Sequence, residues 1–330
     1  MTNFLDTVRS YFEVKNRVWL TGNLEPLRRA ANLESDKNWW VRAGAAVERK
    51  RSAASWRRGD LLRAHTRVNV RDIKQDKEKA LVHADIDEQV TWVYRDGLDY
   101  GVESRVIRHQ QKWRSEDGLW RLKKELEADE VNHFPVPPRS ATLLPLAMTV
   151  PREMPQTRDD HHSRVQFYDR MSGFRYAELW WNGWNPAYPQ LEDDCTNFVS
   201  QCLFAGHLPM QQTDSRSTGW WFRFHSKETE PWSYSWTTSH ALYSYLLSQR
   251  GVKRVSSARD LKVGDVIFYD WSGQGTFHHS TFVVDFDHRG DPLVNAHTDA
   301  SWHRHYLYLD SRAWTARTRY AFVHLPDTLA

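Results

Sequence analysis

Six prolines near the middle of the chain constrain its fold more than any other feature. They stand at positions 135, 137, 138, 145, 151 and 155. Proline lacks a backbone N–H and its ring clashes with the preceding helical turn, so neither a helix nor a central strand tolerates this density. The prolines therefore predict a partly extended linker over residues 134–163, between a first domain at 1–133 and a second at 164–330.

The first domain begins with helical periodicity and then changes to strand-like alternation. Apolar residues from Phe4 to Val18 recur at spacings of three and four, which predicts a helix, and a second helical or mixed segment follows to about Arg63. Alternation then predicts strands, with Asp96-Gly97 as a hairpin turn. We therefore expect an α+β domain of helices and a four-stranded antiparallel meander. The predicted strands are residues 67–73, 81–94, 98–113 and 120–126.

This order of elements resembles the cone-shaped folds of the nuclear-transport-factor or cystatin-like type. No residue pattern in 1–133 points to an active site. The first domain is therefore interpreted as an accessory or dimerisation domain, through which the chain is expected to self-associate.

The pattern of the second domain predicts helices first and an antiparallel sheet afterwards, again an α+β unit. Gly206 and Gly251 follow two of the helices and are typical of the residue just beyond a helix C-terminus. The predicted helices are residues 165–180, 195–205 and 238–249, and the predicted strands are residues 265–271, 279–286, 293–298 and 320–325. The buried face of the helix at 195–205 is expected to carry Phe198, Val199, Cys202 and Leu203.

Charge and cysteine content exclude several classes of protein. A net charge of +3 is too small to indicate nucleic-acid binding. No stretch of 18 apolar residues predicts a membrane span, and the first residues lack the pattern of a signal peptide, so a cytoplasmic protein is expected. Cys195 and Cys202 would lie about 10 Å apart on a helix, too far for a disulfide, and both thiols are expected to be free.

Cys195 stands at the first turn of its predicted helix. Backbone N–H groups at a helix start are unpaired and carry partial positive charge, which favours a thiolate and can also hold an oxyanion. Asp194 precedes it and either caps the helix or faces a cationic group of a substrate, because a carboxylate beside the thiol opposes its ionisation. The alternative is a buried structural cysteine after an ordinary helix cap.

A cysteine nucleophile needs a base, and histidine is the usual one. His279 stands at the start of a predicted strand, with His278 as a competitor. Asn295 and His297 are two residues apart on the next strand and therefore share one of its faces. Neighbouring antiparallel strands could place either beside His279, where it would orient the imidazole.

Residues from about 165 to 325 resemble the bacterial “Putative amidase domain” family, itself similar to the NlpC-type papain-like cysteine peptidases. The order Cys on a helix, His on a strand and a polar residue on the next strand carries the resemblance, and the block Asp194–Gln201 (DCTNFVSQ) is its most specific part. The other matching segments are residues 185–189, 220–221, 235–237, 261–268, 279–280 and 296–298.

The resemblance implies a papain-like fold, with helices packed on an antiparallel sheet, and a set of site residues. It implies Cys195 as nucleophile, His279 as base and His297 as the orienting third member, with Asn295 as the alternative because papain uses Asn there. It also implies that Asp194 faces the amino end of the substrate. Four further residues are candidates for lining the cleft, with core packing as the alternative: Asn197, Trp220, Trp221 and Trp236.

The predicted function is thiol-dependent hydrolysis of an amide bond, without a metal or organic cofactor. By analogy the substrate would be a peptidoglycan-type peptide or a small amide, although peptidoglycan hydrolases normally act outside the membrane. One alternative is a catalytically inactive module that binds peptides or glycopeptides in a papain-like cleft. Another is a zinc protein that uses Cys195, Cys202 and nearby histidines.

Overall fold

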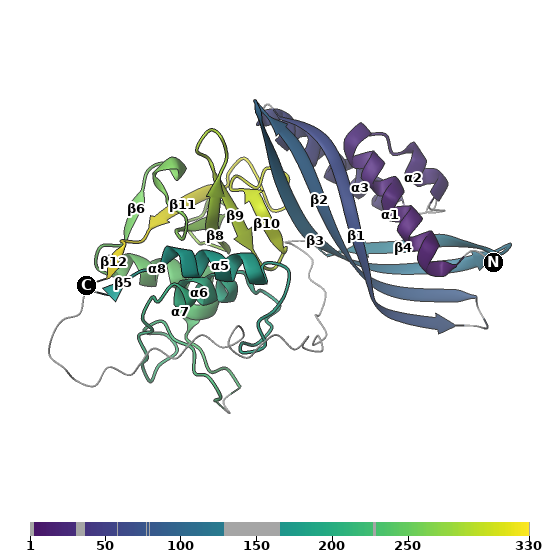
Figure 1. The fold of residues 1–330 in the computed structure, drawn as a ribbon. Coiled ribbons are helices and arrows are strands. Elements are labelled where there is room, and N and C mark those ends of the chain that lie inside the picture. The colour runs from purple at the N-terminus through teal and green to yellow at the C-terminus, as the bar shows by residue number, and fades with distance from the viewer. Residues whose placement is uncertain are drawn as a thin grey trace. The chain divides into compact units, whose positions relative to one another are not determined.

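The computed structural model describes residues 3–30, 37–57, 59–76, 78, 80–128, 166–226 and 229–329. The chain groups into two compact units (Figure 1). One holds Met1–Phe134 together with Leu307–Trp314, and the other holds Pro135–Tyr306 together with Thr315–Ala330. The predicted linker at 134–163 lies outside the described residues. None of the described helices is long and apolar enough to cross a membrane.

The N-terminal unit is an α+β arrangement, as its sequence pattern predicts. Helices lie against one face of a sheet whose four strands pair antiparallel in chain order (Figure 1). The apolar stripe of the first helix, including Val8 and Phe12, is buried against Trp92 and Trp113 of the sheet. The elements are α1 (Phe4–Thr21), α2 (Glu25–Ala30), α3 (Lys37–Trp56), β1 (Gly59–Asp76), β2 (Leu81–Asp96), β3 (Asp99–Glu116) and β4 (Leu119–Glu127).

The first strand begins earlier than its sequence pattern predicts. The second helical segment was expected to reach about Arg63, but α3 ends at Trp56 and β1 begins at Gly59. A register shift between Leu61 and Arg63 interrupts the alternation on which a strand prediction depends. Gly59 is required because a side chain there would come within 2.7 Å of the Arg95 carbonyl oxygen.

Two hairpin loops of this sheet were signalled in the sequence, and the one predicted at Asp96-Gly97 lies one residue further along the chain. Asp96 pairs with Asp99, so Gly97 and Leu98 form a two-residue loop in which Gly97 has a positive φ of 66°. Asp117 and Gly118 form the next loop, with φ values of 50° and 76°. Positive φ at both central residues is the type I′ turn that Asp-Gly favours, because it matches the twist of the paired strands.

The C-terminal unit packs helices on an antiparallel sheet, which confirms its α+β class. Figure 1 shows α5 (Arg170–Trp180) and α6 (Cys195–Ala205) side by side across the strands. The strands pair in the order β10, β9, β8, β7, β11, β6, and β5 pairs separately with β12. The other elements are α7 (Tyr234–Thr237), α8 (Ser239–Ser248), β5 (Gln166–Phe167), β6 (Lys253–Val255), a 3₁₀ turn (Ala258–Asp260), β7 (Val266–Asp270), β8 (His279–Phe286), β9 (Pro292–Ala296), β10 (Ser301–His305), β11 (Arg319–His324) and β12 (Thr328–Leu329).

Helix α6 is the central helix of this unit. The four residues predicted for its buried face are all fully buried, which confirms that prediction. The helix ends at Ala205, directly before Gly206, as predicted, but Gly206 has a φ of −76° and His207 takes the positive φ of 66°. Gly206 is required by packing, since a Cβ there would lie 2.5 Å from the Tyr168 ring.

The Gly264-Asp265 pair before β7 is explained by packing and hydrogen bonds. Gly264 has a φ of 91°, which favours glycine. The buried Asp265 carboxylate accepts the Lys262 and Leu325 backbone N–H groups at 2.8 and 3.0 Å and pairs with Arg170 at 2.8 Å. Gly264 and Asp265 therefore hold β7 and the chain after β11 in place, and their role is structural rather than catalytic.

Candidate functional site

Cys195 is the first residue of α6, and its side chain is only 5% exposed. The first intrahelical hydrogen bond runs from the Phe198 N–H to the Asp194 carbonyl, at 2.9 Å. The amides of Thr196 and Asn197 therefore have no intrahelical partner, as expected for a first turn. The amide of Cys195 also has no partner within the helix, but it donates to Thr298 Oγ1, outside the helix, at 3.1 Å.

Two buried hydroxyl groups lie near the thiol, and a third bonds to one of them. Thr196 Oγ1 and Ser239 Oγ lie 3.7 and 3.8 Å from Cys195 Sγ and 2.8 Å from each other. Thr196 Oγ1 also lies 3.1 Å from Ser280 Oγ. Ser239 is the first residue of α8, so two helix N-termini meet at this sulfur. Hydroxyl donors and helix N-termini both favour negative charge on sulfur.

His279 is buried at the start of β8, whereas its competitor His278 is exposed. The bond between Thr196 and Ser280 brings the start of this strand beside the start of α6. Strand residues alternate in direction, so His279 leaves β8 on the side opposite to Ser280. Its ring centroid lies 5.4 Å from that of Tyr269 and 5.9 Å from that of Trp271.

His297 is bound to the residue that precedes the thiol. Its Nδ1 lies 2.5 Å from Asp194 Oδ2, and its Nε2 donates to the Trp180 carbonyl at 2.7 Å. The ring stacks on Phe198 with 4.1 Å between centroids. The second oxygen of Asp194 accepts the Asn197 side-chain N–H at 2.8 Å. Asp194 is therefore held between His297 and α6, and its 2% exposure leaves little of it to face a substrate.

Asn295, the alternative third member, faces the same helix as His297, as their spacing predicts. Its amide donates to the Ala177 carbonyl at 3.2 Å and to Glu178 Oε1 at 2.9 Å, and its oxygen accepts the His303 backbone N–H at 2.8 Å. These contacts tie β9 and β10 to α5. The structure thus gives Asn295 three partners away from Cys195.

Glu178 and His303 form a titratable pair beside Asn295. His303 Nε2 lies 3.1 Å from Glu178 Oε1, and its Nδ1 lies 3.5 Å from Asp285 Oδ2. Burial alone would lower the pKa of His303, but hydrogen bonds to Asp285 and Glu178 raise it to about 9. An imidazolium bridges α5, β8 and β10 at neutral pH.

This raised pKa makes the C-terminal unit less stable at alkaline pH. The contribution of His303 is fully present below pH 6.5, the ordinary pKa of histidine, and is lost as the pH rises through 9. We expect His303→Asn to cost about 2–3 kcal/mol at pH 6 and much less at pH 10. Asn tolerates the positive φ of 51° at this position, so the variant isolates the imidazole. Amide exchange of β9 and β10 at the two pH values measures this loss of stability. An equal loss at pH 6 and pH 10 would contradict the prediction.

The four residues considered for lining a cleft are buried. Their burial agrees with the alternative interpretation, packing in the core. The three Trp side chains are at most 1% exposed and Asn197 is fully buried. Trp220 Nε1 donates to Ser200 Oγ at 3.0 Å, and Trp236 Nε1 donates to Asn197 Oδ1 at 2.9 Å. Trp221 Nε1 donates to the Thr218 carbonyl at 3.2 Å. Each indole therefore packs in the interior with its N–H bonded.

Sequence reasoning missed Ser239, Glu178 and Thr298. Thr298 follows His297 in a matching segment, and its φ of 73° is rare for a β-branched residue. Its Oγ1 accepts the N–H groups of both Asp194 and Cys195, at 3.0 and 3.1 Å. The position of Thr298 directly after His297, in a segment that matches the family, was the signal that could have made it a candidate site residue. Ser239 and Glu178 lie on helices and carry no comparable signal.

Cys202 lies in the core, away from this chemistry. It is fully buried, and burial raises the pKa of its thiol well above the usual value. Within the described parts of the chain, the groups of side chains that converge closely enough for a metal ion contain neither cysteine. These groups are His109 with Glu125 and Glu127, and His305 with Asp287 and Asp291.

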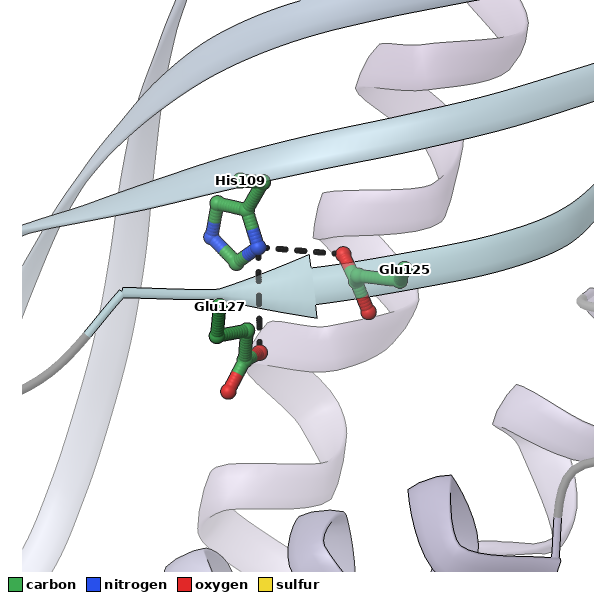
Figure 2. Close-up of side chains that lie close together, drawn as sticks. All are labelled: His109, Glu125 and Glu127. Carbon is green, nitrogen blue, oxygen red and sulfur yellow. Dashed lines mark ion pairs between the residues drawn. The ribbon is translucent and has the colours of Figure 1, made fainter. Parts of the chain in front are cut away.

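The group around His109 is a buried ion-pair cluster in the N-terminal unit. Figure 2 shows His109 facing Glu125 and Glu127, with its Nδ1 3.0 Å from Glu125 Oε1. The Lys15 ammonium lies 2.6 Å from Glu127 Oε1 and 3.0 Å from Glu88 Oε2, where it supplies positive charge that a metal ion would otherwise bring. Burial and Lys15 lower the pKa of His109, but Glu125 and Glu88 raise it to about 9. This cluster is therefore best explained as structural.

Comparison with known proteins bears on the C-terminal unit, where Cys195 starts its helix near two hydroxyl groups. Residues 167–323 match the family model described as “Putative amidase domain”. The matched span includes Cys195, His279 and His297. At a coarse level, this match supports amide hydrolysis by the C-terminal unit.

The chain also resembles two curated proteins of Bacillus subtilis (strain 168). It is 48% identical over 163 residues to “Uncharacterized protein YhbB”, covering 48% of this chain and 51% of that protein. It is 32% identical over 111 residues to “Uncharacterized protein YjcM”, covering 32% of this chain and 24% of that protein. The chain thus spans about half the length of the first relative and a quarter of the second. No solved structure matches significantly.

Proposed function

We propose that the C-terminal unit hydrolyses amide bonds with Cys195 as its nucleophile. The observation that carries the proposal is the position of this thiol at the start of α6, with hydroxyls of Thr196 and Ser239 3.7 and 3.8 Å from its sulfur. Hydroxyls at this place are able to donate to a thiolate, which is the reactive form of cysteine. The family match supports the same class of reaction.

In the proposed reaction, His279 takes the thiol proton and the sulfur attacks the carbonyl carbon of the amide. The nitrogen–carbon bond then breaks, the amine leaves with the proton from His279, and water hydrolyses the thioester. The His279 ring lies beside Tyr269 and Trp271, so this step requires the ring to come within hydrogen-bond reach of Sγ. His297 would act as a positioning residue, because its ring holds Asp194 directly before the thiol.

The papain-like fold and a peptidoglycan-type peptide substrate belong to this proposal through the family resemblance. The alternative function is an inactive module that binds peptides or glycopeptides. The buried indoles favour neither function, because they lie in the core.

Replacement of Cys195 by alanine tests the proposal. We expect Cys195→Ala to reduce turnover to background on whichever members of a peptide, small-amide and muropeptide panel the wild type cleaves, because no thioester can form. Cys202→Ala is the matched control and should keep turnover, since that thiol lies in the core. Turnover that survives Cys195→Ala would contradict the mechanism. A wild type that cleaves no panel member and alkylates slowly with iodoacetamide near neutral pH would favour the binding module.

A further inference from the structure

Thr298 is partly exposed and lies directly against the start of α6. Its Oγ1 accepts two backbone N–H groups, from Asp194 at 3.0 Å and from Cys195 at 3.1 Å. A hydroxyl oxygen has two acceptor lone pairs and one proton to donate. Both lone pairs are taken by these amides, so the proton of Thr298 is left for an acceptor other than the two amides.

The backbone at Thr298 is strained. A β-branched residue with a φ of 73° costs on the order of 1–3 kcal/mol, and Gly or Asn would adopt the same conformation more easily. The contacts of the preceding His297 with Asp194 and the Trp180 carbonyl hold the chain in this place. Turn geometry alone therefore gives no reason for threonine here, whereas the hydroxyl has two defined partners.

The Cys195 amide is the usual oxyanion donor at a cysteine on a helix start. Here that amide is already bonded to Thr298, so it could serve an oxyanion only by giving up this bond. A hydroxyl that accepts from two amides is itself a stronger donor, because hydrogen bonds in a chain polarise one another. The Thr298 hydroxyl lies beside the Cys195 amide and can donate its proton without giving up either bond that it accepts.

We propose that the Thr298 hydroxyl donates to the oxyanion formed at Cys195. This inference rests on the proposed function, since it requires Cys195 as nucleophile. As sulfur bonds to the carbonyl carbon, the π electrons of the carbonyl move onto its oxygen, which accepts the Thr298 O–H. When the oxygen re-forms its double bond, the bond to the leaving group breaks and that group departs with the electron pair.

The experiment compares two reactions of the same thiol in the full-length protein. Acetylation by p-nitrophenyl acetate passes through an oxyanion and releases p-nitrophenolate, whereas alkylation by iodoacetamide displaces iodide and forms no oxyanion. We expect Thr298→Val to slow acetylation of Cys195 by about 100-fold and to change alkylation by less than about twofold. Thr298→Ser keeps the hydroxyl and should retain acetylation. Mass spectrometry of the Cys195 peptide measures both rates.

Valine is as strained as threonine at this φ, so the two variants differ mainly in the hydroxyl. Ser301→Ala removes another buried hydroxyl, one that donates to the Asp299 carbonyl at 2.7 Å, and should leave the ratio of the two rates unchanged. Equal slowing of both reactions in Thr298→Val would assign Thr298 a structural role, and unchanged acetylation would leave the Cys195 amide as the donor. Either result overturns the inference about Thr298 but leaves Cys195 as the proposed nucleophile. A wild type whose Cys195 is not acetylated would overturn both proposals.

Discussion

Lys15→Met is expected to lower the free energy of unfolding of the N-terminal unit by about 3–5 kcal/mol. Lys15 is 7% exposed, and its ammonium lies within 3.0 Å of carboxylates of Glu88 and Glu127. Burial alone would lower its pKa, but the two carboxylates raise it well above the usual value, so the ammonium stays charged. Removing it leaves the fully buried Glu88 and Glu125 with less positive charge than they need.

Amide exchange of β2 and β3 in the full-length protein measures this loss, because it reports on one unit separately from the other. Lys124→Met, on the exposed face of the same sheet, is the matched control and should change stability by less than about 0.5 kcal/mol. Adding Glu88→Gln to Lys15→Met should recover at least half of the loss, since it removes one of the uncompensated charges. A loss below about 1 kcal/mol in Lys15→Met would contradict the prediction.

The sequence carried a signal for this cluster. Lys15 falls on the helical stripe of Val8, Phe12 and Val18, and Glu88 falls two residues before Val90 on the inner face of β2. A lysine and a glutamate on two facing apolar stripes indicate a buried pair. Which charges meet could not be predicted, because the partners are 73 residues apart in the chain and only the packed fold aligns them.

Secondary structure was predictable where one local rule dominated. The bounds predicted for β8, residues 279–286, agree with the structure, because an apolar run between two turns defines the strand. Strand β10 was missed, because Ser301–His305 is polar except for Trp302 and a register shift against β9 between Ser301 and Arg304 removes its alternation. Gly206 was correctly predicted to follow the helix, but the reason for glycine there is the Tyr168 ring, which is distant in the chain.

The candidate site was predictable in its nucleophile segment and less so in its partners. The helix start at Cys195 follows from local sequence, since Asp194 precedes an apolar helical run. The indoles of Trp220 and Trp236 were equally consistent with a cleft and a core, and only their burial decides for the core. The sequence also left open whether Asp194 caps the helix or contacts a substrate. Its partner is His297, which lies 103 residues away in the chain, so local sequence could not decide.

Asp194→Ala is expected to destabilise the C-terminal unit by about 3–5 kcal/mol. The substitution removes a buried carboxylate and leaves His297 and Asn197 each without one hydrogen-bond partner. His297 would lose the carboxylate 2.5 Å from its Nδ1 while its other nitrogen stays bound to the Trp180 carbonyl. Asn197 would lose the oxygen that its side-chain N–H donates to at 2.8 Å. Asp194→Asn keeps a hydrogen-bonding group in the same volume and should recover most of the loss.

The exposed neighbour Asp193 provides the matched control, and Asp193→Ala should cost less than about 0.5 kcal/mol. Amide exchange in α6 and β9 measures all three variants, because Asp194 directly precedes α6 and its partner His297 directly follows β9. If Asp194 instead faces the amino end of a substrate, Asp194→Ala will leave exchange unchanged and raise KM for peptides with a free amine. The 2% exposure of Asp194 argues for the first result, since a carboxylate that recognises a substrate must be reachable by it.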